Sequence, residues 1–277
     1  MDKQQVWFIT GASKGLGLSF VKQLLAAGHQ VAATSRSAQE LAAAVGTVGA
    51  SFLPLQVNLA DENSVAKALQ QTVDKFGRLD VVVNNAGYGI GGSLEELTDT
   101  EVRQGFDVNV FGTINVIRKA LPYLRAQRSG HIINIASIAG ITAVAGWAIY
   151  AAAKHAIIGL SEVLAADVKE LGIKVTVVAP GAFRTNFLDP GSIVITGNHI
   201  PDYTAVHEMH QRFLQMDGAQ AGDPEKAVAA MIRITTMPNP PELLLLGTDA
   251  YKRAFNKLEQ LGNEYKAWEA ITTATDY

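Results

Sequence analysis

Along the chain, short runs rich in Val, Ile and Leu alternate with longer runs whose apolar positions recur at the helical period. The short runs predict strands at residues 6–10, 30–35, 51–57, 79–85, 130–137, 174–180 and 241–247. The longer runs predict helices near residues 15–27, 38–45, 61–76, 99–126, 149–171, 224–236 and 249–271. Because strands and helices alternate, the pattern predicts an α/β fold: a Rossmann-like, doubly wound sheet of seven parallel strands with helices on both faces.

The length and the apolar content favour one domain. With 277 residues, 48% of them hydrophobic, the chain can bury one large core, so we expect a single domain over residues 1–277. Residues 187–223 show no strong periodicity and are long for a plain connection, which indicates a substrate lid. Residues 249–277 continue past the last strand and are expected to form a C-terminal helical extension.

Composition removes several classes of function. The net charge of −3 shows no basic excess, so we expect neither a nucleic-acid partner nor a membrane surface. The absence of cysteine excludes disulfides and thiol catalysis. The N-terminus has no signal-peptide pattern and no uninterrupted apolar run reaches membrane-spanning length, so we expect a cytoplasmic protein. His207 and His210 are interpreted as lid residues, and no metal site is predicted.

The stretch TGASKGLG, Thr10 to Gly17, lies between the first strand and the first helix. Glycines at this junction let the backbone approach an anion at the helix N-terminus, which is typical of a phosphate cradle. The spacing differs from the G-x-G-x-x-G fingerprint, and Lys14 is not followed by Ser or Thr as in a Walker loop. A turn that only requires positive φ is the alternative interpretation.

The end of the second strand predicts which dinucleotide would bind. NAD-binding sheets carry an acidic residue there, whereas this chain has Thr34, Ser35 and Arg36. Arg36 and Lys14 could both contact a 2′-phosphate, so the sequence favours NADP(H). The alternative interpretation is that Arg36 and Lys14 are solvated surface charges with no ligand.

Ser137 follows the fifth predicted strand, and Tyr150 and Lys154 share one helix face at i and i+4. An ammonium group and a cationic nicotinamide would stabilise a phenolate and lower the pKa of Tyr150 from about 10. Tyr150 could then exchange a proton with an alcohol oxygen, and Ser137 could hydrogen-bond the same oxygen.

In their order, these motifs make the chain resemble a classical short-chain dehydrogenase/reductase of the NADP type over residues 4–250. The motifs are TGASKGLG, NNAG, Asn109 in FDVNVFGT, Ser137 in IINIASIAG, YAAAK, and PGAFRT. Members of this family use the spacing G-x-x-x-G-x-G in the first loop, which accounts for the departure from the denser fingerprint.

The resemblance implies a role for each motif residue. The catalytic residues would be Ser137, Tyr150 and Lys154, with Asn109 supporting a water chain to Lys154, which also binds the nicotinamide ribose. Asn58 stands where many relatives have aspartate and would flank the adenine with Leu59. The implied cofactor-binding residues are Gly11, Ser13, Lys14, Gly15, Leu16 and Gly17 in the first loop; Ser35, Arg36, Asn58 and Leu59 beside the adenosine; Asn85, Ala86 and Gly87 at its ribose; and Tyr150, Lys154, Pro180, Gly181, Phe183 and Thr185 around the nicotinamide.

Apolar residues surround the predicted catalytic group and fill the predicted lid, which favours an apolar ketone, aldehyde or secondary alcohol. We therefore expect an NADP-dependent carbonyl reductase or alcohol dehydrogenase. A 3-oxoacyl carrier-protein reductase is the enzymatic alternative, and a non-catalytic dinucleotide-sensing protein is the alternative of another class. In this family the helices predicted at 99–126 and 149–171 commonly pack against their symmetry copies, so we expect a homodimer or homotetramer.

Overall fold

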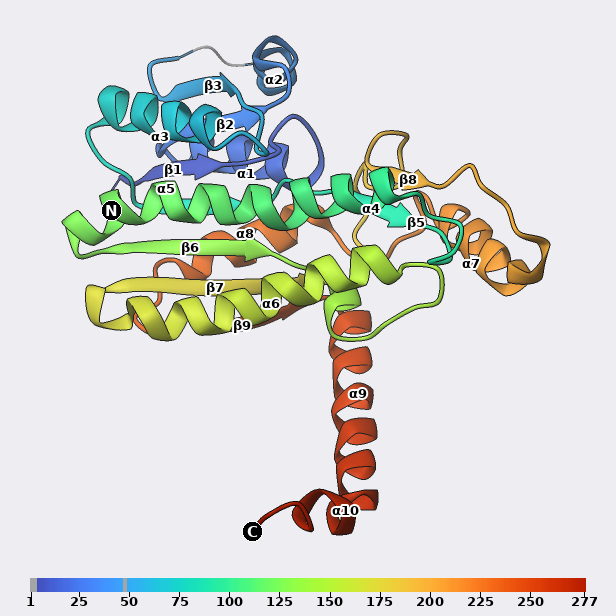
Figure 1. Ribbon diagram of the computed structural model, residues 1–277. Helices are drawn as coiled ribbons and strands as arrows, with labels where there is room; N and C mark the ends of the chain where they lie inside the picture. The colour runs from blue at the N-terminus through green and yellow to red at the C-terminus, as the bar shows by residue number, and fades with distance from the viewer. Residues whose placement is uncertain (1–3, 47–48) are drawn as a thin grey trace.

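A parallel sheet forms the centre of the computed structural model, which describes residues 4–46 and 49–277. Within these residues seven strands pair in the order β3-β2-β1-β4-β6-β7-β9 (Figure 1). The predicted doubly wound α/β sheet is therefore confirmed, with strand ends shifted by a few residues. The strands are β1 (Val6–Ile9), β2 (Gln30–Ser35), β3 (Phe52–Gln56), β4 (Val81–Asn84), β6 (Gly130–Ile135), β7 (Ile173–Pro180) and β9 (Leu243–Leu246).

Both faces of the sheet are buried, because side chains alternate along each strand. Trp7 and Ile9 of β1 join the core against one layer of helices, while Phe8 joins the core against the other layer. All three side chains are fully buried. The first layer contains α1 (Gly15–Ala26), α2 (Ala38–Val45) and α8 (Pro224–Ile234), and the second contains α3 (Glu62–Phe76), α5 (Gly112–Gln127) and α6 (Ala148–Val168).

The single helix predicted at 99–126 is divided into three pieces, and that part of the prediction is wrong. It consists of α4 (Asp99–Phe106), one π-helical stretch η1 (Asp107–Phe111), and α5. A capping box between Thr98 and Glu101 begins α4. A π turn adds a residue without breaking the helical run of apolar positions, so periodicity could not detect it.

Residues 187–223, here called the cap, are more ordered than their sequence pattern suggested. They contain β8 (Ile193–Ile195), the short turn η4 (Pro201–Tyr203) and α7 (Thr204–Leu214). Strand β8 pairs in parallel with β5 (Gly89–Gly91), a strand that follows β4 and was not predicted. The cap is therefore hydrogen-bonded to the segment after β4, at the carboxyl edge of the main sheet (Figure 1).

The C-terminal segment forms two helices instead of the one predicted, α9 (Thr248–Ala267) and α10 (Glu269–Thr273). Figure 1 shows α9 projecting from the body of the molecule, with α10 at its far end. Two further short turns, η2 (Ile138–Gly140) and η3 (Lys169–Leu171), flank α6.

One helical segment, Ala148–Leu171, is long and apolar enough to cross a membrane by length and composition. The sequence expectation overlooked it, because charged residues interrupt the apolar run. This segment contains α6, which packs against β7 and η2, as expected for a core helix.

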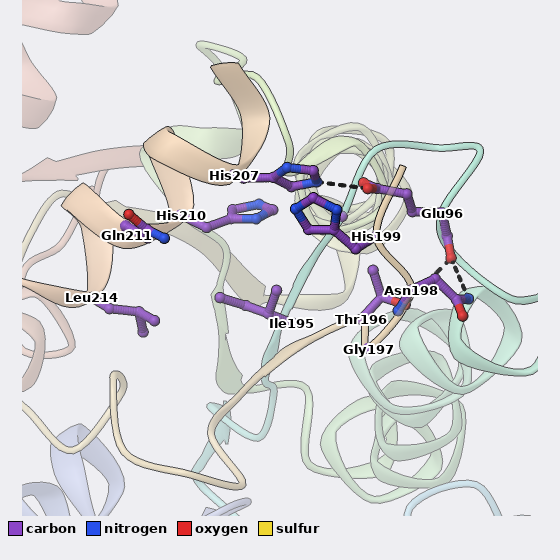
Figure 2. Close-up of a pocket in the computed structure, with 11 residues that line it drawn as sticks. Glu96, Ile195, Thr196, Gly197, Asn198, His199, His207, His210, Gln211 and Leu214 are labelled. Atoms are coloured by element: carbon purple, nitrogen blue, oxygen red, sulfur yellow. Dashed lines mark hydrogen bonds and ion pairs between the residues drawn. The ribbon is translucent and has the colours of Figure 1, made fainter. Parts of the chain in front are cut away.

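A buried carboxylate fastens the cap. Oε1 of Glu96 accepts hydrogen bonds from the backbone N–H of Ile200 at 2.8 Å and from Nε2 of His207 at 2.6 Å, and Figure 2 shows the second of these. Its other oxygen accepts from the hydroxyl and N–H of Ser93, and its carbonyl accepts from the amide of Asn198. The hydrogen bond from the Ile200 N–H lowers the pKa of Glu96 most, whereas burial raises it. Together with the hydrogen bonds from His207 and Ser93, it lowers this pKa to about 2. Glu96 is therefore charged at neutral pH.

Replacing Glu96 should loosen the cap. In Glu96→Gln, an NH2 group replaces one of the two acceptor oxygens and faces hydrogen-bond donors. Either the hydrogen bonds from Ile200 and His207 or those from Ser93 are then lost. We expect trypsin to cleave after the exposed Arg212 of α7 several-fold faster than in the wild type. The control is Glu95→Gln, an exposed neighbour whose carboxylate, within the described part of the chain, accepts a hydrogen bond only from the Tyr203 hydroxyl. Equal cleavage rates in the two variants would show that Glu96 does not hold the cap.

Candidate active site

The predicted site residues gather where β1 and β4 end side by side, at the point where the strand order reverses. The buried Thr10 links the two strand ends: its hydroxyl donates to the carbonyl of Val83 at 3.4 Å and accepts the backbone N–H groups of Asn85 and Ala86, each at 3.0 Å. In return, Nδ2 of Asn85 donates to the carbonyls of Thr10 and Gly11. Sequence analysis did not assign Thr10 a role, although it directly precedes the first glycine.

The glycines of the first loop occupy positions that a larger residue could not. Gly11 has φ +66°, and a Cβ there would lie 2.7 Å from Cα of Ala86. A Cβ on Gly17 would lie 2.6 Å from Nδ2 of Asn85. Lys14 is the N-cap residue of α1, but its side chain does not cap the helix. The first backbone N–H groups of α1 are therefore available to an anion. The loop fits a bound phosphate group.

Two cations stand near this loop. A hydrogen bond of 2.9 Å from the N–H of Ala12 to the carbonyl of Thr34 holds the loop against the end of β2. Arg36, just past β2, is exposed, and neither its side chain nor that of Lys14 has a hydrogen bond or ion pair with the described residues. The hydroxyl of Ser35 is engaged in the turn, where it donates to the carbonyl of Ser37. The two cations therefore remain available to a ligand.

The predicted adenine-flanking residues lie after β3 and hold their own turn. Oδ1 of Asn58 accepts the N–H of Ala60, and the carbonyl of Leu59 accepts the amide of Asn115. Asn58 is exposed, and Leu59 is half-buried. Their contact with an adenine stays a prediction.

Lys154 is buried deep in the site. Its Nζ donates to the carbonyl of Ile135 at 2.9 Å and lies 5.8 Å from the centre of the Tyr150 ring. Burial disfavours the charged ammonium and lowers the pKa of Lys154 to about 8. The lysine therefore changes its charge close to physiological pH.

The pKa of Tyr150 departs from the sequence-based expectation of a lowered value. Burial raises it to about 12, and the hydrogen bond with Ser137 offsets only part of this effect. In the protein alone, desolvation of the phenolate is the larger of these two effects, and the charge of a nicotinamide is not part of that balance. Tyr150 is thus held as a neutral phenol that can donate a proton.

Asn109 lies within the π-helical stretch η1 and faces the same site. Its amide donates to the carbonyls of Tyr88 and Gly105 and accepts the N–H of Tyr88. A Cβ on Gly87 would lie 2.6 Å from Oδ1 of Asn109 and 3.2 Å from Nζ of Lys154. Gly87, Asn109 and Lys154 are therefore direct neighbours, as the motif spacing implied.

The loop after β7, from Pro180 to Thr185, curves across the site toward the glycine loop. The Cβ of Thr185 would lie 3.6 Å from a Cβ on Gly15. Phe183 forms a bridge with Gly222 at the end of the cap. The N–H of Ala182 donates to Oδ2 of Asp249 at 2.9 Å, so the first turn of α9 anchors this loop. Nothing in the sequence pattern indicated that role for Asp249.

The two histidines spaced i and i+3 have separate partners. His207 binds Glu96, and Nε2 of His210 bonds to the carbonyl of Gly146 at 2.9 Å. Both side chains line a cavity of about 240 Å³ between the cap and the segment that follows β5, shown in Figure 2. They therefore serve to attach the cap, in agreement with their interpretation as lid residues.

Known proteins resemble this chain over its whole length. Residues 5–192 match the short chain dehydrogenase family. Oxidoreductase BOA17 of Botryotinia fuckeliana is 33% identical over 272 residues, which cover 98% of this chain and 99% of that protein. The 3-ketodihydrosphingosine reductase of Bacteroides thetaiotaomicron is 38% identical over 237 residues, 86% of each chain. A short-chain dehydrogenase from Streptomyces avermitilis superposes with a TM-score of 0.92 and 34% identity, covering 99% of this chain and 100% of that one.

Two more distant structures contain a dinucleotide. ElxO, solved with NADP bound, has a TM-score of 0.71 and 26% identity and covers 88% of this chain and 97% of its own. A short chain dehydrogenase/reductase from Burkholderia phymatum, solved with NAD, has a TM-score of 0.82, covers 95% of each chain and, at 23% identity, shares the fold. Since the family match spans most of the chain and full-length relatives share its fold, this protein belongs to the short chain dehydrogenase family of oxidoreductases.

Proposed function

We propose that this protein is an NADP(H)-dependent oxidoreductase that interconverts an apolar ketone or aldehyde and the corresponding alcohol. The observation that carries the proposal is the apolar wall around Tyr150. The ring centre of Trp147 lies 6.5 Å from that of Tyr150, with the two rings edge-on. The ring centre of Phe187, in the cap, lies 5.9 Å from that of Tyr150. Phe213 of α7 lies 5.0 Å from Trp147. A substrate that reaches the tyrosine hydroxyl would contact these rings, which favours an apolar molecule.

The residues of the chain supply the acid–base half of the reaction. A bound nicotinamide supplies or accepts the hydride at the carbonyl carbon. In the reducing direction Tyr150, a neutral phenol because its pKa is raised, donates its proton to the carbonyl oxygen. Ser137 hydrogen-bonds the same oxygen as negative charge develops on it. Lys154 and Asn109 lie behind Tyr150, where we propose that they bind the ribose and return a proton to the phenolate.

The free cations favour NADP(H) over NAD(H). Lys14 lies in the glycine loop and Arg36 directly after β2, and neither side chain has a hydrogen bond or ion pair with the described residues. No carboxylate at the end of β2 opposes a 2′-phosphate, since the residues there are Thr34, Ser35 and Arg36. ElxO was solved with NADP, in keeping with this choice.

The named relatives support a ketone substrate without fixing it. The relative from Bacteroides thetaiotaomicron is named for reduction of 3-ketodihydrosphingosine. A 3-oxoacyl carrier-protein reductase and a non-catalytic dinucleotide sensor are the alternatives, and a turnover assay separates all three. We also propose that the protein is cytoplasmic and that it forms a homodimer or homotetramer in which α5 and α6 contact their copies. Two large apolar side chains are exposed there: Phe111, the last residue of η1 directly before α5, and Val163 of α6.

Loss of the Tyr150 hydroxyl should abolish most turnover. For NADPH and a panel of apolar ketones, Tyr150→Phe should lower kcat by about 10²–10⁴-fold, because only the proton donor is removed. NADPH binding should stay nearly unchanged, and Tyr123→Phe, on the exposed face of α5, should behave as wild type. Turnover of carrier-protein thioesters alone would support the alternative enzyme, and absence of turnover with every carbonyl would support the sensor. Full activity in Tyr150→Phe would refute the assignment of the acid.

The pKa of Lys154 predicts the pH dependence of cofactor binding. Because that pKa is lowered to about 8, the ammonium is present below this pH and lost above it. The Kd for NADPH should therefore rise about tenfold or more between about pH 7 and pH 10, as expected for loss of a hydrogen bond to a charged group. Lys154→Met should bind NADPH weakly at all pH values and lack this step. A step of the same size in Lys154→Met would assign the titration to another group.

The cofactor preference should depend on Arg36. Wild type should bind NADPH more tightly than NADH, since each charged hydrogen bond to the 2′-phosphate contributes roughly 1.5–3 kcal/mol. Rising salt should weaken the preference, because charges at this exposed site are screened over about 10 Å at 0.1 M. Ser35→Asp with Arg36→Ala should invert it by placing a carboxylate against the phosphate.

Titration of both cofactors against wild type and the double variant decides the question. Arg125→Ala is the matched control, because Arg125 is an exposed arginine in the last turn of α5, at the opposite edge of the sheet. Equal binding of NADH and NADPH by wild type, or an unchanged preference in the double variant, would contradict the NADP assignment.

A further inference from the structure

Trp147 stands between the catalytic tyrosine and the cavity beneath the cap. The ring centre of Trp147 lies 6.5 Å from that of Tyr150 and 5.0 Å from that of His210, edge-on in both pairs. His210 lines the cavity of about 240 Å³, whereas Tyr150 is not among the described residues that line it. With only 5% of its surface exposed, Trp147 fills the space that separates the tyrosine from the cavity.

The far end of the indole closes this separation. A Cβ on Gly91 would lie 3.2 Å from Cη2 of Trp147, 3.0 Å from Nε2 of His210 and 3.3 Å from Cγ1 of Ile195. Three atoms that lie this close to one point leave no room for a substrate chain between them. His210 and Ile195 both line the cavity, so the indole completes a partition that is one side chain thick. We use the name partition for Trp147, His210 and Ile195.

The backbone before Trp147 is held from two directions. The carbonyl of Gly146 accepts the N–H of Gly92 at 2.9 Å and bonds with Nε2 of His210, also at 2.9 Å. Because a carbonyl can only accept, Nε2 of His210 carries a proton. Gly146 has φ +81°, and a Cβ there would lie 2.6 Å from the same nitrogen. These bonds and the burial of the ring keep the indole in the partition.

The space beyond the partition suits an alkyl chain. Ile195 and Leu214 contribute apolar side chains to its lining, as Figure 2 shows. Thr196 and Asn198, which also line it, both donate to the carbonyl of Glu96. Their polar groups are already paired, so contacts with a chain would come from the apolar side chains. Asn198 and Leu214 are exposed, which shows that the cavity opens to solution and that a chain could extend through it.

We propose that Trp147 determines the length of the ketone that the protein accepts, by closing the substrate site at the end that faces the cavity. This inference rests on the proposed function, because it concerns the apolar substrate of Tyr150. A ketone whose oxygen reaches the tyrosine hydroxyl, and whose longer substituent points toward the partition, must end at the indole. The cavity is therefore unused in the wild type. Without the indole, the site and the cavity are continuous and a longer substituent fits.

The chain-length profile with NADPH tests this inference. The quantity measured is the ratio of kcat/KM for methyl octyl ketone to kcat/KM for methyl ethyl ketone, in which a general loss of activity cancels. Trp147→Ala should raise this ratio at least about tenfold over the wild type, since a single methylene can change specificity by that factor. The matched control is Phe187→Ala. It removes a ring that lies 5.9 Å from Tyr150 and is not among the described residues that line the cavity, and it should change the ratio far less.

Two further variants locate the longer chain. Trp147→Phe keeps an aromatic ring but draws its far end back from Ile195 and His210, so it should raise the ratio less than alanine does. It decides the question if Trp147→Ala turns over neither ketone. Leu214→Trp places a large side chain in the cavity. By itself it should leave the wild-type ratio unchanged, and combined with Trp147→Ala it should cancel most of the gain.

The outcomes separate this inference from the proposed function. An unchanged ratio in the Trp147 variants, with methyl ethyl ketone still reduced, would overturn the inference and leave the proposed function standing. A gain that Phe187→Ala matches, or that Leu214→Trp does not reduce, would overturn it as well. Absence of turnover of every carbonyl by the wild type would refute the proposed function and this inference with it.

Discussion

The hydroxyl of Thr10 is the interaction on which the rest of the site depends. It is buried where the strand order reverses, donates to the end of β4 and accepts two backbone N–H groups from the turn that follows. An unpaired hydroxyl in this position would be costly, so the two loops are held in one relative position. That position sets the distance between the glycine loop, which fits a phosphate, and the turn at Gly87, which contacts Asn109 and Lys154.

Burial then gives the catalytic side chains their protonation states. Lys154 is buried and Tyr150 is partly buried, and desolvation lowers the pKa of the lysine and raises that of the tyrosine. The tyrosine therefore stays a proton donor, while the lysine remains charged up to about pH 8. The aromatic wall from Trp147 and the cap maintains this burial, and Glu96 holds the cap in place.

The last helix holds one loop of the site. Its first turn binds the loop after β7 through Asp249, and Ala250 and Ala254 are buried beside Ile138. The later turns of α9 extend away from the body of the molecule, as Figure 1 shows. The position of the loop therefore depends on the first turns of this helix.

The sequence by itself determined the seven strands of the main sheet and the identity of the motif residues, because these depend on local pattern. Periodicity indicated the sheet, the i and i+4 spacing placed Tyr150 and Lys154 on one helix face, and the order of the motifs added Ser137 through the family resemblance. Only the tertiary structure decided the π turn at Asn109, the attachment of the cap by Glu96 and the anchoring by Asp249, since each joins residues that no local period relates. It also gave the raised pKa of Tyr150 in the protein without nicotinamide, because desolvation depends on everything packed around the phenol and not on its neighbours in the chain.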